Sequence, residues 1–458
     1  MQNLVNETKV LLNLSLPLIA LLLAQKFLQI ISTYMMGHIG AQALAAGALV
    51  SSIYLIFIII GIGTLNAVGI LIAQAYGENN KEIVNLYLYH GLYASLLLSL
   101  PFLIIIYFAP ALYSLFYQNS VLIKLSAQLL HALMWGFPAL LGFAALREFV
   151  SALNYQWTIM VISFFAIPFN LVLFYIVYHT SLFSIAWIGY INAITEWGMF
   201  IILLIYINKN KMLKNYTHLP SVTKLQKSIF KIIFRIGIPS GLTSSLEVIM
   251  STTIVIMMGY FGIISLAAHQ IAFQCVTFAY MVPLGIGLAI GLRVSKKGGL
   301  HQHSQALALS VYSALGIEAI FSFLVIVIFI LFPITLTNLF IHPYQSGYLL
   351  VVQTTKKFLL IAAFFHCFDA LQGIIMGILR GLRDTFIPMF IALFSFLVVA
   401  LGGGYFLAFI LKLQGVGLWL GLAAGLAISS LFLSLRLYKH YVKIKRIPNN
   451  TMVEVIPN

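Results

Sequence analysis

Five ionisable residues stand inside long apolar stretches of the chain. They are one lysine, Lys26, and four acids, Glu196, Glu247, Glu318 and Asp369. If those stretches cross a membrane, each charge costs on the order of 3 kcal/mol there, and such residues are functional candidates by default. A carboxylate oxygen suits a cation such as Na⁺, and a desolvated carboxyl can instead carry a proton. These residue types therefore suggest the binding and release of a cation.

Glu247 and Asp369 form the strongest pair for this chemistry. Two carboxylates on facing helices repel each other, and a bound cation or one proton relieves the repulsion. We predict that this pair is the cation-coupling site, taking Na⁺ or H⁺. The alternative is a pair of neutral acids that are hydrogen-bonded into the helix packing. The polar residues expected near the pair are His269, Gln270, Gln274, His366 and Gln372.

The other three charges carry weaker hypotheses. Glu196 and Glu318 lie in the middle of apolar stretches, either as packed or lumen-facing acids or as members of a cation relay. Lys26 stands about ten residues before the Gly37 turn, roughly 15 Å along a helix. A lysine side chain does not easily snorkel so far. We expect a cleft-facing charge paired with an acid, or else a local distortion of the bilayer.

The composition indicates which elements hold these residues. Of the 458 residues, 62% are hydrophobic and 8% are charged, and the mean hydropathy is +1.04. A soluble protein of this size carries roughly a quarter charged residues, so the chain must sit in a bilayer. The net charge of +15 reflects a shortage of acids, because only ten are present, and is no sign of nucleic-acid binding.

Windows of about 20 apolar residues predict twelve membrane-spanning helices. With both termini in the cytoplasm, twenty of the 25 lysines and arginines fall on the cytoplasmic side, as the positive-inside rule requires. The first stretch, Leu11 to Met36, is too long for a signal peptide. The spans are expected near 11–36, 45–74, 86–109, 128–152, 158–178, 185–207, 232–258, 265–292, 306–332, 354–379, 386–411 and 416–438.

The second half of the chain repeats the first. A shift of 222 positions aligns residues 35–46 with 257–268, with seven identities in twelve positions. It also aligns Pro17 with Pro239 and Gly63 with Gly285. Because each half has six spans, we predict a parallel repeat about a pseudo-two-fold axis along the membrane normal, with a substrate cleft between lobes. The domains expected are an N-lobe at 1–207, a cytoplasmic linker at 208–230, a C-lobe at 231–440 and a cytoplasmic tail at 441–458.

Several short sequences in both halves are similar to those of one transporter family. The first half has Leu16-Pro17, the turn Met36-Gly37-His38-Ile39-Gly40 and the sequence Gln74-Ala75-Tyr76-Gly77. The second half has Glu247, Ala267-Ala268-His269-Gln270 and the stretch Asp369-Ala370-Leu371-Gln372 that leads to Leu379-Arg380-Gly381. With these features the chain resembles the multidrug and toxic compound extrusion (MATE) transporters, in particular their bacterial NorM-like branch.

The resemblance implies an all-α integral membrane protein with two six-helix bundles. It implies export of cationic amphipathic compounds in exchange for Na⁺ or H⁺, in a bacterial inner membrane and without a cofactor. Many bacterial members have an aspartate before the Met-Gly turn, where this chain has Ser32. We therefore place the coupling chemistry in the C-lobe.

Other functions fit the sequence less well. A lipid-linked flippase of the same superfold would need a basic cavity, which Lys26 alone hardly provides. An integral-membrane enzyme or sensor would need clustered catalytic residues, and no Walker-type loop, HExxH or CxxC sequence occurs. We expect a monomer in the bilayer that acts on small organic molecules and binds no nucleic acid.

Overall fold

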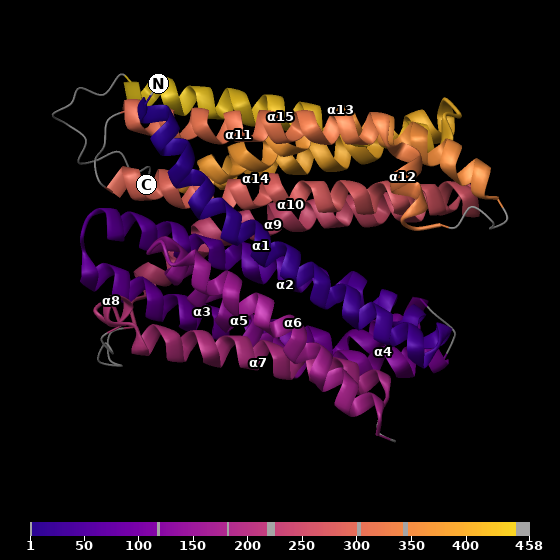
Figure 1. Ribbon diagram of the computed structural model, residues 1–458, viewed down its shortest axis with the longest axis horizontal. Coiled ribbons are helices and arrows are strands. Elements are labelled where there is room, and N and C mark those ends of the chain that lie inside the picture. The colour runs from indigo at the N-terminus through magenta and orange to yellow at the C-terminus, as the bar shows by residue number, and fades with distance from the viewer. Residues whose placement is uncertain are drawn as a thin grey trace. The chain divides into compact units, whose positions relative to one another are not determined.

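The structure is a computed structural model, and it describes residues 2–116, 120–180, 183–217, 225–299, 304–341 and 347–445. Twelve helical stretches of this part of the chain are long and apolar enough to cross a membrane, which confirms the predicted number. Figure 1 traces them. In the first half the helices are α1 (Gln2–Ile39), α2 (Ala41–Gly77), α3 (Lys81–Phe116), α4 (Ser120–Leu133), α5 (Phe137–Ala152), α6 (Gln156–Tyr178) and α7 (Ile185–Lys209).

The second half begins after the short helix α8 (Lys211–Lys214). Of the predicted linker, residues 218–224 lie outside the described residues, as do residues 446–458 of the predicted tail. The helices of this half are α9 (Lys227–Gly259), α10 (Ile263–Gly299), α11 (Ser304–Leu331), α12 (Pro333–Asn338), α13 (Tyr348–Gly381), α14 (Phe386–Leu393) and α15 (Gln414–Lys445).

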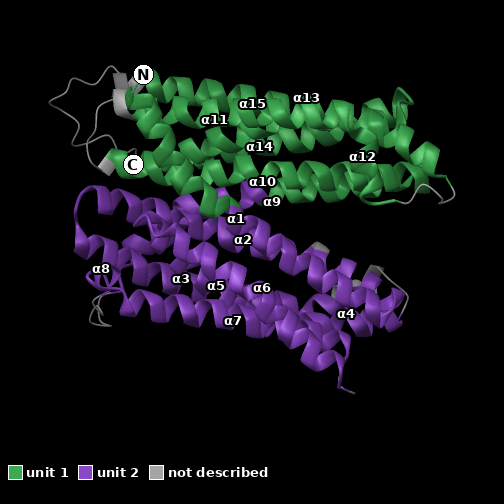
Figure 2. Cartoon of the chain, viewed as in Figure 1, with its two compact units in different colours: residues 1–19, 245–458 green, residues 20–244 purple. Residues whose placement is uncertain are grey.

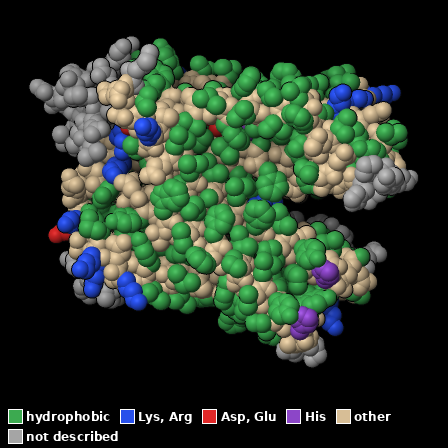
Figure 3. Space-filling view, viewed as in Figure 1, with side chains coloured by type: hydrophobic (Ala, Val, Ile, Leu, Met, Phe, Trp, Pro, Cys, Tyr) green, Lys and Arg blue, Asp and Glu red, His purple; other side chains and the backbone are tan. Residues whose placement is uncertain are grey.

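Two of the predicted spans are not single regular α-helices. The fourth consists of α4 and α5, joined by a 3₁₀ turn at Met134–Gly136, and Pro138 stands in the first turn of α5, where its missing N–H costs little. The eleventh continues from α14 into the π-helical segments Phe394–Gly403 and Phe406–Ile410. On the face shown in Figure 3, hydrophobic side chains cover the middle of the helices, and most lysines and arginines lie towards the helix ends.

The chain divides into two compact units whose boundaries fall inside helices (Figure 2). Unit 1 comprises residues 1–19 and 245–458, and unit 2 comprises residues 20–244. The lobes predicted from the sequence, 1–207 and 231–440, are instead divided at the polar linker, residues 208–230. The difference arises because the first parts of α1 and α9 each pack with the helices of the other half. Both boundaries come shortly after a proline, Pro17 in α1 and Pro239 in α9.

The repeat seen in the sequence is present in the helices. α2 and α10 are both 37 residues long, and both of their ends are related by the shift of 222 positions. Each is preceded by a glycine in the left-handed region, Gly40 with a φ of 137° and Gly262 with a φ of 90°. Only glycine adopts such angles without strain, so the matched glycines mark the same turn in each half.

The matched glycines Gly63 and Gly285 make equivalent close approaches. In unit 2, a Cβ atom on Gly63 would lie 2.6 Å from the Cα atom of Gly241 in α9. In unit 1, a Cβ atom on Gly285 would lie 3.1 Å from the backbone nitrogen of Ile19 in α1 and would overlap the side chain of Ile19. Residues 19 and 241 are themselves 222 positions apart. The first part of α9 in unit 2 and the first part of α1 in unit 1 therefore each cross another helix at the matched glycine.

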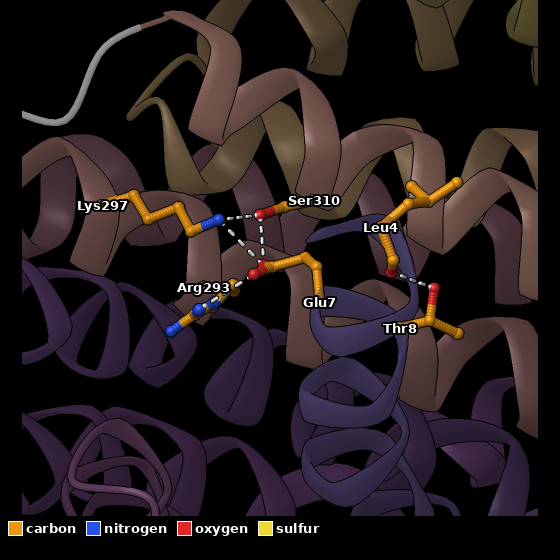
Figure 4. Close-up of polar contacts among 6 residues, drawn as sticks. All are labelled: Leu4, Glu7, Thr8, Arg293, Lys297 and Ser310. Carbon is orange, nitrogen blue, oxygen red and sulfur yellow. Dashed lines mark hydrogen bonds and ion pairs between the residues drawn. The ribbon is translucent and has the colours of Figure 1, made fainter. Parts of the chain in front are cut away.

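Two ionic clusters fasten helix ends within unit 1. Arg293 donates to both carboxylate oxygens of Glu7, at 3.0 and 3.1 Å, and Lys297 donates to Oε1 at 2.9 Å (Figure 4). The hydroxyl of Ser310 donates to the same Oε1 atom at 2.6 Å. These bonds tie the beginning of α1 to α10 and α11. Bidentate arginine pairs of this kind are among the stronger polar contacts of proteins.

The second cluster centres on Asp384, in the turn between α13 and α14. Its Oδ2 atom accepts from Arg436 Nε at 2.6 Å and lies 2.7 Å from His440 Nε2, both on α15. Burial alone would raise the pKa of Asp384, but the hydrogen bonds and charges of His440 and Arg436 outweigh burial and lower it. The ionised carboxylate therefore links the turn to α15.

The close contact between Gly63 and Gly241 gives a first prediction. We expect Gly63→Ala to destabilise the protein by about 1–3 kcal/mol, because the added methyl group meets backbone atoms that cannot rotate away. Gly316→Ala in the middle of α11 is the matched control, since a Cβ atom there has no neighbour within 4 Å. Thermal unfolding of the purified variants in detergent measures the difference. Equal melting temperatures for the two variants would contradict the close contact at Gly63.

The Asp384 cluster gives a second prediction. We expect Asp384→Asn to lower stability at pH 7 by roughly 1–3 kcal/mol, because a charge-assisted pair is lost. The pKa of Asp384 is lower in the folded state, so its contribution is complete above the unfolded value near 4 and disappears as the pH falls through the folded value. Unfolding curves of wild type and variant should therefore converge only in acid. A gap that widens on acidification would refute this assignment.

Candidate functional site

A seam of glycines brings α10 and α13 of unit 1 together. A Cβ atom on Gly287 of α10 would lie 2.7 Å from the carbonyl oxygen of Gly373 in α13, and one on Gly377 would overlap the carbonyl group of Gly287. One turn further along, a Cβ atom on Gly381 would lie 2.5 Å from the carbonyl oxygen of Gly291. Small residues at four-residue spacing allow helices to approach closely in membranes. The backbones of α10 and α13 are thus held in a fixed register.

Asp369 lies one turn before Gly373 on α13 and is 5% exposed. It interacts electrostatically with Glu247 of α9 and with Glu318 of α11, and α11 also packs against α13. The structure therefore brings together three of the four acids that the sequence singled out. They come from three helices, α9, α11 and α13.

Tyr280 of α10 completes this group of side chains. It interacts electrostatically with Glu247, Asp369 and Glu318, and also with Arg380 near the end of α13. Its hydroxyl would lie 3.5 Å from a Cβ atom placed on Gly373, so it lies against α13 one turn from Asp369. A phenol can donate to a carboxylate or accept from a protonated acid.

None of the three acids is in an ion pair within the described part of the chain. Nor do three His, Cys, Asp or Glu side chains meet closely enough there to hold a metal ion by themselves. The acids are near enough to repel each other, so uptake of a proton or of a monovalent cation at the pair Glu247 and Asp369 would relieve the repulsion. These carboxylates, which no described lysine or arginine pairs with, are the candidate site.

The polar residues that we expected near the pair divide into two sets. His366 is fully buried and Gln372 is 4% exposed; both lie on α13, three residues before and after Asp369. His269 instead belongs to an aromatic cluster, with its ring stacked on Phe273 at 5.6 Å and edge-on to Trp419 at 5.5 Å. Gln270 is exposed and Gln274 is half-buried.

Unit 2 has a polar network without a central carboxylate. Ser32 and Asn192 exchange hydrogen bonds of 3.0 and 3.1 Å, and Asn170 donates to Thr195 at 2.9 Å. Glu196, the next residue on α7, is half-buried and interacts electrostatically with Tyr54. Ser32 thus occupies a packed, hydrogen-bonded position.

Lys26 is half-buried on α1, and its ammonium donates to Oε1 of Gln29 at 3.2 Å. Its partner in the described part of the chain is an amide rather than the acid that we considered. The expected role in the cleft remains a prediction.

Sequence reasoning missed Tyr280 and the buried pair of Arg147 and Glu148. Tyr280 stands in a stretch rich in aromatic residues, and nothing in its spacing distinguishes it. Arg147 donates to Glu148 at 2.9 Å, and both side chains are less than a tenth exposed. Arg147 and Glu148 both fall inside the predicted span 128–152, although neither is among the ionisable residues singled out from the sequence. Adjacent opposite charges within a predicted span were the available signal.

Comparison with known proteins gives one family. The MatE family model matches residues 17–176 and again residues 239–406. The two matches begin 222 positions apart, which is the shift of the internal repeat.

Curated relatives match over almost their whole length. A probable multidrug resistance protein NorM of Pseudomonas putida is 33% identical over 436 residues, covering 93% of each chain. The protein of the same name from Synechocystis is 30% identical and covers 96% of each chain. Among solved structures, the eukaryotic MATE transporter AtDTX14 superposes with a TM-score of 0.86 at 22% identity, covering 97% of this chain and 99% of that one. An outward-facing multidrug resistance MATE transporter superposes with a TM-score of 0.87 at 18% identity, covering 96% and 97%.

Proposed function

The chain belongs to the MatE family of multi-pass membrane transporters, and we propose that it exports organic compounds in exchange for a cation, Na⁺ or H⁺. The curated relatives are named as multidrug resistance proteins, which supports cationic and amphipathic compounds as the substrate class. The proposal includes residence in a bacterial inner membrane with both termini in the cytoplasm, the orientation that places most of the lysines and arginines on that side.

The observation that carries this proposal is the uncompensated group of acids in unit 1. Asp369 is buried and is repelled by Glu247, and no described lysine or arginine pairs with either of them. A purely structural acid in a membrane would be expected to have a cationic or hydrogen-bonded partner. Two repelling acids without a described cationic partner form a site whose net charge falls when a cation or a proton binds.

Ion binding drives export through a difference in affinity between conformations. When Glu247 and Asp369 are neutralised, α9 and α13 repel each other less and can pack differently. The ion must prefer one arrangement of the transporter by a few kcal/mol for the population to shift appreciably. The gradient of that ion then supplies the work for moving the organic compound in the opposite direction.

The proposal predicts that Asp369→Asn and Glu247→Gln each reduce export to the level of cells without the protein. Both changes keep the shape of the side chain and most of its hydrogen bonding but remove the charge that binds the ion. Efflux of ethidium from cells, with and without Na⁺ and with a protonophore, measures coupling and identifies the ion.

Ser32→Ala is the control in unit 2, and it should retain most of the export. Membrane extracts should contain similar amounts of all variants, which separates loss of coupling from loss of folding. If both acid variants exported ethidium like wild type while Ser32→Ala stopped export, the coupling site would lie in unit 2 instead.

Lys26 gives a further prediction about substrate range. An ammonium that has only an amide partner and faces the substrate path would repel cations, so Lys26→Ala should speed the efflux of doubly charged dyes. A Coulomb term of about 1 kcal/mol corresponds to roughly a fivefold change. Lys26→Arg keeps the charge and should behave as wild type. Unchanged transport of every dye by Lys26→Ala would remove this role.

A further inference from the structure

Glu318 is an acid of unit 1 for which the proposed exchange at Glu247 and Asp369 gives no role. It lies in the middle of α11 and is 4% exposed. The hydroxyl of Ser322, one turn later on α11, donates to its Oε1 atom at 2.8 Å. Its Oε2 atom is buried and makes no hydrogen bond. The carboxyl group thus has one local donor and one oxygen without a partner.

This setting disfavours a permanent negative charge. An ionised carboxylate taken from water into an apolar interior costs several kcal/mol unless a cation and further hydrogen bonds compensate it. One serine hydroxyl is weak compensation, and no ion pair to Glu318 occurs in the described ranges. A single carboxylate is also too small a ligand set to replace the hydration shell of Na⁺. A proton neutralises the group without any further ligand.

His366 supplies a second, independent observation at the same place. Its ring is fully buried, and neither ring nitrogen has a hydrogen-bond partner. The ring meets Phe321 edge-on with centroids 6.2 Å apart, and Phe321 lies between Glu318 and Ser322 in sequence on α11. A neutral imidazole has one donor and one acceptor, and leaving both unsatisfied in a buried position is unusual. His366 therefore has a donor and an acceptor that no described group uses, and its ring contacts α11 one turn from Glu318.

The charge of Glu318 acts on the coupling pair. The titratable groups that interact with it are Asp369 and Cys367 of α13 and Tyr280 of α10. While Glu318 holds a proton, Asp369 is repelled by Glu247 alone. Once Glu318 loses its proton, a second negative charge acts on Asp369 and makes cation binding at the pair more favourable. Linkage requires the reverse effect as well, so a cation at the pair favours release of the proton from Glu318.

We propose that Glu318 is a second proton-binding residue of unit 1, separate from Glu247 and Asp369, and that its protonation sets the affinity of that pair for the coupling ion. The proton comes from and returns to water, and the carboxyl group alternates between neutral acid and carboxylate. Proton binding by Glu318 stands on its own geometry, whereas its effect on coupling rests on the proposed function.

Infrared difference spectra recorded during a pH titration test the proton directly. A protonated carboxyl group has a carbonyl stretch well apart from that of a carboxylate, and the measurement needs no transport. Wild type, Glu318→Gln, Asp369→Asn and Glu196→Gln are compared after reconstitution in phosphatidylcholine nanodiscs. We expect Glu318→Gln to remove one titrating carbonyl component that Asp369→Asn and Glu196→Gln both retain. A spectrum of Glu318→Gln identical to that of wild type would overturn the proposal.

Ser322→Ala keeps the test decisive if Glu318→Gln does not fold. This variant retains the acid but removes its described hydrogen bond, so the component assigned to Glu318 should shift in frequency while the others stay in place. A shift supports the assignment, and an unchanged spectrum refutes it.

Ethidium efflux at several pH values then tests the effect on coupling. Glu318→Gln should still export ethidium. Its export should no longer change with pH over the range in which the infrared component assigned to Glu318 titrates. If this variant lacked the infrared component but its export depended on pH as in wild type, the effect of Glu318 on coupling would be refuted. Proton binding by Glu318 would still be supported. Normal export by Asp369→Asn would refute the proposed function and leave the Glu318 assignment intact.

Discussion

The cost of an ionised group in hydrocarbon is the constraint on which the arrangement of this protein depends. Near helix ends the chain meets that cost by pairing, as Glu7 does with Arg293 and Lys297, Glu148 with Arg147, and Asp384 with Arg436. In the middle of unit 1 the acids have no such described partner. Glu247, Glu318 and Asp369 come near each other with no described cation among them. Glu318 and Asp369 are buried and Glu247 is half-buried, so on the proposed function mobile cations or protons would take the place of fixed ones.

Close helix packing makes this arrangement specific. Gly287, Gly373 and Gly377 remove side chains from the contact between α10 and α13, so the register of the two backbones is fixed by direct contact. Tyr280 and Asp369 are positioned by that register. An aromatic cluster of Phe358, Phe365 and Trp419 packs α13 against α15 further along the bundle. Asp369 therefore stands on a helix whose position against α10 is set by direct backbone contact.

Much of this architecture could be predicted because it depends on residue types that form recognisable patterns in the sequence. The twelve spans follow from runs of apolar residues, and the repeat follows from matched glycines and prolines, of which Gly40 and Gly262 have positive φ angles. Glu247 and Asp369 could be identified because charge is rare in such runs. The exchange of the first parts of α1 and α9 could not be predicted, because hydrophobicity records that a helix is buried but not which helices bury it. Tyr280 and the aromatic surroundings of His269 depend on tertiary contacts in the same way.

The reciprocal placement of α1 and α9 has a consequence for the origin of the chain. A single repeat of six helices would have had no partner for the first part of its own first helix, since residues 1–19 and 227–244 each pack in the unit formed by the opposite half. Two copies of such a chain could satisfy each other by trading those segments, as domain-swapped homodimers do. Gene fusion would then have joined two protomers that were already interlocked. On this scheme the polar linker would join the two copies, and the different acids of the two halves would have arisen after the fusion.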